Sequence, residues 1–182
     1  MKTLSDSEAD RLFDKYWDEM GQEWFKLEVL QDYSAEDDSL SLRSWYRGDK
    51  QKSIEQIKAS EYREWIESCQ KKLEQGVKLI RLHVVNKPYS PYIKWELEHY
   101  RYVNVPKCGE QVYLVDKADI SVLELPHGDV MIFDRTRAVV NAYNPQGLVI
   151  SQTFYDESDD ISQLLELVKK LKKLAQPMHD FS

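Results

Sequence analysis

The spacing of apolar residues predicts a chain of alternating helices and strands. Apolar side chains recur every three or four positions, the period of an amphipathic helix, over residues 8–20, 53–75, 90–103 and 161–175. Within 53–75, Ser60-Glu61 is a candidate break. Short apolar runs without that period predict strands at 24–30, 77–85, 111–115, 119–125, 129–134, 137–143 and 148–154. We therefore expect helices packed on one sheet.

The connections favour an α+β class, layered, with a mixed and largely antiparallel sheet of about six or seven strands. The turns after residue 111, including Pro126-His127-Gly128 and Asn144-Pro145-Gln146-Gly147, are too short for parallel crossovers and predict a meander. No internal repeat or linker divides the sequence. We expect one domain over 1–182 with a folded core at 8–176, a mobile polar loop at 31–43 and a mobile tail at 177–182.

Composition and charge limit the kinds of binding partner that we expect for this protein. The formal net charge is −7, and Lys and Arg mostly alternate with acids. Binding to nucleic acid needs clustered cations, so we expect no direct nucleic-acid partner. No apolar run approaches ~20 residues and the N-terminus has no hydrophobic stretch, so we expect no membrane association and a cytoplasmic location. Cys69 and Cys108 form no CxxC and are expected to be free thiols.

Familiar catalytic and cofactor motifs are missing from the sequence. It has no GxSxG, HExxH, GxxxxGK[ST] or GxGxxG, and its four histidines are scattered. No two histidines stand one helical turn apart, the spacing of an HExxH metal site. We expect no cofactor and no metal, and we lean against an enzyme, although catalytic triads do assemble from residues far apart in sequence.

The segment 77–110 contains most of the residues that could form a binding site. Arg81 and His83 interrupt the same face of an otherwise apolar strand at 77–85. On the following helix, tyrosines and Glu96 fall near one side at three- and four-residue spacing. The candidate ligand-binding residues are Glu28, Arg81, His83, Tyr92, Glu96 and Tyr100. The alternative is a structural network in which Arg81 pairs with Glu96 or Glu28 and fixes helix on sheet.

A series of marks recurs in order along the chain. They are Leu27-Glu28, Tyr33, Gly48-Asp49, Trp65, Gly76-Val77, Arg81 to Val85, Pro88 to Tyr92, Glu96, Asn104, Gly109-Glu110, Asp129 to Asp134, Tyr143 and Gly147. Over residues 10–176 the chain resembles an uncharacterised family of small bacterial proteins, a domain of unknown function often encoded beside helix-turn-helix regulators. The resemblance implies a layout similar to half of a phospholipase D-like fold.

That superfamily's catalytic element, HxKxxxxD, is not reproduced. His83 is followed at the second position by Val85, and His99 by Arg101, with Pro106 where the aspartate would stand. The resemblance therefore brings no hydrolase activity and favours a regulatory or binding role.

Three functions compete. The first is a non-catalytic cytosolic regulatory protein that binds a protein partner, such as a helix-turn-helix regulator, or a small ligand near Arg81 and Glu96. The second is a small enzyme with a pocket of Glu28, Arg81, His83 and Glu96. The third is a structural module that forms a homodimer or larger homo-oligomer through its aromatics.

Overall fold

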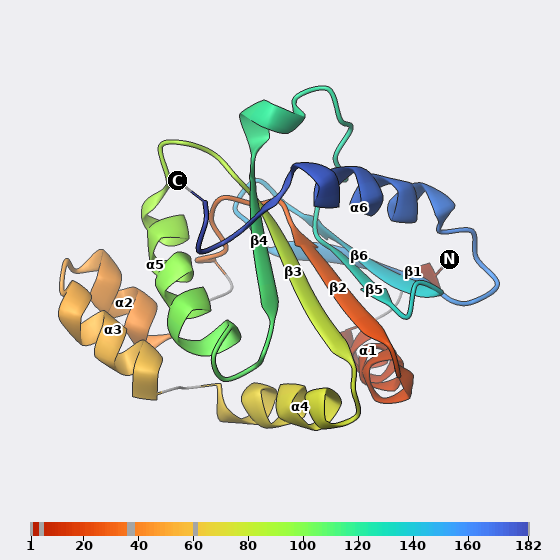
Figure 1. Ribbon diagram of the computed structural model, residues 1–182, viewed down its shortest axis with the longest axis horizontal. Coiled ribbons are helices and arrows are strands. Elements are labelled where there is room, and N and C mark those ends of the chain that lie inside the picture. Colours follow the sequence, from red (N-terminus) through yellow and green to blue (C-terminus); the bar gives the residue numbers. More distant parts are fainter. Residues whose placement is uncertain (1, 4–5, 36–38, 60–61, 182) are drawn as a thin grey trace.

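A mixed β-sheet forms the centre of the molecule in the computed structural model, which describes residues 2–3, 6–35, 39–59 and 62–181 (Figure 1). Within these residues eight strands pair in the order β1-β7-β6-β5-β2-β3-β4-β8. They are β1 (Lys2–Thr3), β2 (Glu23–Glu28), β3 (Lys78–Val85), β4 (Gln111–Asp116), β5 (Val130–Phe133), β6 (Arg137–Tyr143), β7 (Val149–Tyr155) and β8 (Gln176–Pro177). The β2–β3 and β3–β4 pairs are parallel and the other pairs are antiparallel. The predicted α+β class and largely antiparallel sheet are confirmed.

The helices lie in two layers, one on each face of this sheet. They are α1 (Asp6–Glu19), α2 (Leu40–Tyr46), α3 (Lys50–Ala59), α4 (Arg63–Glu74), α5 (Pro91–His99), the π-helical turn η1 (Tyr100–Asn104), the 3₁₀ turn η2 (Lys117–Ile120) and α6 (Ser162–Leu174). One core cluster joins α6 and η2 to the sheet, and the other joins it to α1–α5 and η1. Figure 1 shows α6 well apart from α1, α4 and α5.

Side-chain alternation along the central strands makes the two faces chemically different. On β2, Phe25 and Leu27 pack in the core under α6, while Lys26 and Glu28 point to the opposite face. On β3, Arg81 lies on the same face as Glu28 and is buried. The face under α1–α5 therefore holds buried charge at its centre, and this charge needs partners.

Two of the predicted helices differ from the observed helices in their length. The helix expected at 53–75 is two helices, α3 and α4, with residues 60–61 outside the described part of the chain. The helix expected at 90–103 begins as predicted, because Ser90 accepts a hydrogen bond from the Ile93 amide at 3.0 Å, but its last turn widens into η1.

The predicted meander was wrong at its start. Residues 119–125 are not a strand: the Asp116 side chain accepts the Ala118 amide and starts η2, and Val122 is 89% exposed. The helical crossover of α5 and η1 returns the chain parallel to β3, so β4 pairs with β3, and only β5, β6 and β7 form the meander.

The structure describes parts of the two segments that were expected to be mobile. The end of the 31–43 loop is already helical, because α2 begins at Leu40, and residues 36–38 lie outside the described residues. In the tail, Pro177 pairs with β4 and Phe181 packs against the core. The mobility of both segments stays a prediction, as does the likeness to half of a phospholipase D-like fold.

Candidate functional site

A cavity of about 450 Å³ lies on the charged face of the sheet, between the central strands and helices α1, α4 and α5. Nine of its lining residues are Phe, Trp or Tyr. The polar lining includes Lys26, Glu28, Arg81, Glu96 and Asp129. A concave, mostly aromatic surface with a few convergent polar groups is the usual form of a small-molecule site.

The floor of the cavity is a buried ion network centred on Arg81. Its Nη1 lies 2.6 Å from Glu28 Oε1 and its Nε lies 2.6 Å from Glu110 Oε2. Lys26 Nζ reaches the same Glu28 oxygen at 2.7 Å, and Asn104 donates to Glu110 at 3.0 Å. Burial opposes ionisation of Glu28, but Arg81 and Lys26 outweigh it and hold the pKa of Glu28 well below its usual range. Arg81 thus pairs with Glu28, as one alternative expected, and with Glu110 rather than Glu96.

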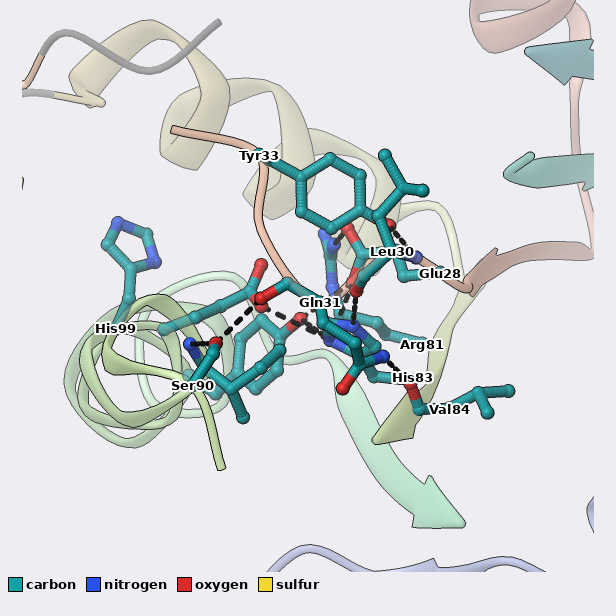
Figure 2. Close-up of polar contacts among 12 residues, drawn as sticks. Glu28, Leu30, Gln31, Tyr33, Arg81, His83, Val84, Ser90 and His99 are labelled. Carbon is teal, nitrogen blue, oxygen red and sulfur yellow. Dashed lines mark hydrogen bonds and ion pairs between the residues drawn. The ribbon is translucent and has the colours of Figure 1, made fainter. Parts of the chain in front are cut away.

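His83 lies beneath this floor and has no exposed surface. Its Nε2 lies 2.8 Å from the Leu30 carbonyl, and its Nδ1 lies 2.9 Å from the Tyr100 hydroxyl and 3.2 Å from Glu96 Oε2. Burial lowers the pKa of His83, but Glu96 and Glu28 outweigh it and raise that pKa to about 9. The imidazole is therefore charged at neutral pH. Figure 2 shows these contacts converging below Leu30.

The loop after β2 is tied down over the cavity by Gln31 and by the start of α5. Gln31 Nε2 donates to the Val84 carbonyl at 2.6 Å, and its Oε1 accepts the Asn86 amide at 2.7 Å. The Ser90 hydroxyl donates to the Gln31 carbonyl at 2.7 Å, as Figure 2 shows. These bonds fix the loop that presents Tyr33 to the cavity.

Two tyrosines cover a buried carboxylate at one side of the cavity. The Tyr33 hydroxyl donates to Asp129 Oδ1 at 2.7 Å, and the Tyr143 hydroxyl donates to Oδ2 at 3.0 Å. The ring of Tyr33 lies 5.8 Å from the rings of both Tyr92 and Tyr143. Burial raises the pKa of Asp129. Gly128 allows this arrangement, because a Cβ there would overlap the carbonyl oxygen of Asn141.

Several buried polar atoms around the cavity lack hydrogen bonds within the described part of the chain. The indole N–H groups of Trp24 and Trp95 have no acceptor, and Glu96 Oε2 accepts no hydrogen bond of good geometry. Buried polar groups are paired in most proteins, so each exception calls for an explanation. All three residues line the cavity.

Five of the six predicted site residues line the cavity together: Glu28, Arg81, Tyr92, Glu96 and Tyr100. The sixth, His83, supports them from below. Their role in ligand binding stays a prediction.

The predicted site did not include further lining or supporting residues, namely Trp24, Lys26, Tyr33, Glu110, Asp129 and Tyr143. The last four stand among the recurring marks of the sequence but were not assigned to a site. Glu110 and Asp129 each follow a glycine at the start of an apolar run, which was the available signal.

Two sets of donor atoms lie close enough to share a metal ion. In one, Glu28, His83 and Glu96 offer atoms within 4.8 Å of one another, and in the other Cys69, Cys108 and Glu110 do. Local sequence spacing reveals neither set. The carboxylates of Glu28 and Glu110 already accept bonds from Arg81, which competes with a metal for their lone pairs. The arrangement suits an organic ligand better than a metal ion bound by these side chains.

Comparison with family models gives a match over residues 11–182 to a family described as "Domain of unknown function (DUF6879)". The chain belongs to this family. The predicted membership of an uncharacterised domain family is thereby confirmed, whereas bacterial origin and neighbouring regulator genes stay predictions. A search of curated proteins found no match. Among the described residues no helix combines the length and apolarity needed to cross a membrane.

One solved structure similar to this chain is described as "Structure of TrmBL2, an archaeal chromatin protein, shows a novel mode of DNA binding". The TM-score is 0.43 at 14% identity, over 93% of this chain and 51% of that one, so the chain spans about half its length. The expectation of no direct nucleic-acid partner conflicts with this finding and is wrong as an exclusion. It rested on the net charge of −7 and on the alternation of Lys and Arg with acids along the sequence, neither of which shows where cations gather on the folded surface. A likeness this weak assigns no ligand to the present chain.

Proposed function

We propose that the protein is a non-catalytic regulatory or binding domain that holds a small molecule in the aromatic cavity above β2 and β3. The observation that carries this proposal is the cavity of about 450 Å³, within the usual range for ligand sites, with nine aromatic residues around buried charges. Its indole N–H groups and Glu96 offer unused hydrogen-bonding capacity to a ligand.

A binding role fits the buried ionisable groups better than an acid–base role. A general acid or base must reach its substrate within hydrogen-bond distance. His83 has no exposed surface, and both of its ring nitrogens already have partners. Glu28 accepts bonds from Lys26, Arg81 and Tyr100, which hold its charge in place rather than free it to exchange protons.

The test is a thermal-shift screen with a variant that fills the cavity. Asn141 lines the rim and is half-buried, so Asn141→Trp places an indole in the cavity without replacing a core residue. Val122→Trp adds the same side chain at a position that is 89% exposed and outside the cavity lining. We expect compounds that raise the Tm of the wild type and of Val122→Trp but not of Asn141→Trp. Stabilisation that persists in Asn141→Trp, or no stabilising compound at all, contradicts the proposal.

A further inference from the structure

Glu96 is the buried carboxylate of the cavity with the fewest partners. It is 7% exposed, and its one ionic contact among the described residues is with His83, whose Nδ1 lies 3.2 Å from Oε2. Among the described residues no donor bonds to its Oε1. The other carboxylates differ, since Glu28, Glu110 and Asp129 each accept at least two good hydrogen bonds. Glu96 therefore retains capacity to accept a bond from a ligand.

The charged groups around the cavity are unequal in number. The connected acids are Glu28, Glu96, Glu110 and Asp129. The cations are Lys26, Arg81 and His83, the last with its pKa raised to about 9. Four acids thus face these three cations, while His99, which also lines the cavity, bonds Asn104 through Nδ1 at 2.8 Å. An uncompensated buried charge is costly, and a positively charged ligand would offset it.

The walls nearest Glu96 are aromatic. Tyr92 and Trp95 come from the same helix, with ring centroids 5.3 Å apart, and Tyr33 lies 5.8 Å from Tyr92 on the facing loop. Tyr33 also lies 6.1 Å from the ring of His83, which contacts Glu96. Aromatic faces attract cations within about 6 Å, most strongly when water is excluded. A carboxylate among such rings is suited to an ammonium group.

Building on the proposed binding function, we infer that the ligand is a small protonated amine with an aromatic or apolar body, whose ammonium group donates to Glu96. The rings of Tyr33, Tyr92 and Trp95 surround the positive charge, and the remaining aromatic lining holds the body. Lys26 and Arg81 do not oppose this placement, because Glu28 and Glu110 already pair with them. The ammonium shares the Glu96 carboxylate with His83, whose Nδ1 contacts Oε2, and therefore donates to Oε1.

The probe set is 2-phenylethylamine, 2-phenylethanol and phenylacetate, three compounds with one aromatic body and a positive, neutral or negative end. Isothermal titration with the full chain at neutral pH measures each affinity. We expect the amine to bind about ten-fold tighter than the alcohol, the factor that a desolvated cation–aromatic contact supports, and phenylacetate to bind most weakly.

Glu96→Gln tests the assigned residue because it keeps the shape of the side chain and removes the charge. We expect the amine to lose its advantage in this variant while the alcohol binds as before, which also shows that the pocket is intact. Glu98→Gln, on the same helix but outside the cavity lining, is the matched control and should retain the ten-fold preference.

The outcomes separate this inference from the proposed function. If the alcohol or phenylacetate binds as tightly as the amine, and Asn141→Trp abolishes that binding, the cavity is a ligand site but the amine assignment is wrong. If none of the three probes binds at low millimolar concentration, the amine assignment is also wrong. The proposed function fails separately, when the wider screen finds no compound whose effect depends on Asn141.

Discussion

At the scale of the residue, Arg81 decides whether the buried acids are tolerated. It supplies hydrogen bonds to both Glu28 and Glu110 and is itself 6% exposed. Its loss leaves the buried Glu110 without its cation and leaves Glu28 with Lys26 alone. Removal of one partner from a buried ion pair typically costs about 3–5 kcal/mol. The network therefore positions the cavity floor, and a pocket role for Glu28 does not exclude a structural one.

We expect Arg81→Ala to lower the free energy of unfolding by about 3–5 kcal/mol in urea titrations followed by tryptophan fluorescence. Arg101→Ala is the control, because Arg101 makes an exposed ion pair with Glu98 that is worth about 1 kcal/mol at most. Equal, small effects of both substitutions would show that the buried network does not hold the fold.

His83 gives stability a dependence on pH. Its pKa rises from 6.5 when unfolded to about 9 in the folded state. The folded protein therefore binds the proton more tightly, and the resulting stabilisation is fully present below pH 6.5. It is lost as the pH rises through 9, by roughly 1.4 kcal/mol per pH unit within that window.

Denaturant titrations at several pH values between 6.5 and 9 measure this slope. We expect His83→Gln to be less stable overall and to lose the decline, whereas His179→Gln, at an exposed position, should keep it. A wild-type curve that stays flat or rises over this range would mean that His83 is neutral in the folded protein.

At the scale of the element, the turn between β5 and β6 is bonded to the residues that lead into β2, the strand beside β5. Asp134 and Arg135, at the centre of the three-residue connection 134–136, have φ of 50° and 63°, and the Thr136 amide donates to the Phe133 carbonyl at 3.1 Å. Aspartate tolerates positive φ better than most residues. The Asp134 carboxylate accepts the amides of Gly21, Gln22 and Glu23 at 2.8–2.9 Å. Partial burial opposes its ionisation, but these amides outweigh it and lower the pKa of Asp134.

Asp134→Ala should cost about 1–3 kcal/mol because three amides lose their acceptor, two of them exposed enough to bond water instead. Asp134→Asn should cost less, since its carbonyl oxygen can still accept two of them. Urea unfolding of both variants measures the order. An Asn variant no more stable than the Ala variant would contradict the capping role.

Local sequence patterns predicted whether most segments are helices or strands, but they did not predict which strands pair. The strand at 77–85 and the capped start of α5 at Ser90 were predictable from alternation and from a serine before a proline. The prediction for 119–125 was wrong because its apolar residues do not belong to a strand: Ile120 ends the 3₁₀ turn capped by Asp116, and Leu123 and Leu125 pack on the core from an irregular segment. The pairing of β4 with β3 depends on where α5 packs, which no local window contains.

At the scale of the whole molecule, the site is assembled from segments far apart in sequence. Glu28 and Tyr100 are 72 positions apart and Tyr33 and Asp129 are 96, yet each pair is hydrogen-bonded. Glu28 and Arg81 could be recognised in the sequence as candidate site residues, because a charged residue inside an apolar strand is buried and needs a partner. Glu110 and Asp129 could not be recognised in this way, because each comes just before a strand begins, where a carboxylate is equally often exposed to solvent.

The most direct measurement of the central claim is a crystal structure of the protein with a stabilising compound from the screen. We expect electron density for the compound in the cavity between Glu96 and the central strands, in contact with Tyr33 or Tyr92. A compound bound elsewhere, with the cavity holding only water, would contradict the assignment of this face of the sheet as the ligand site.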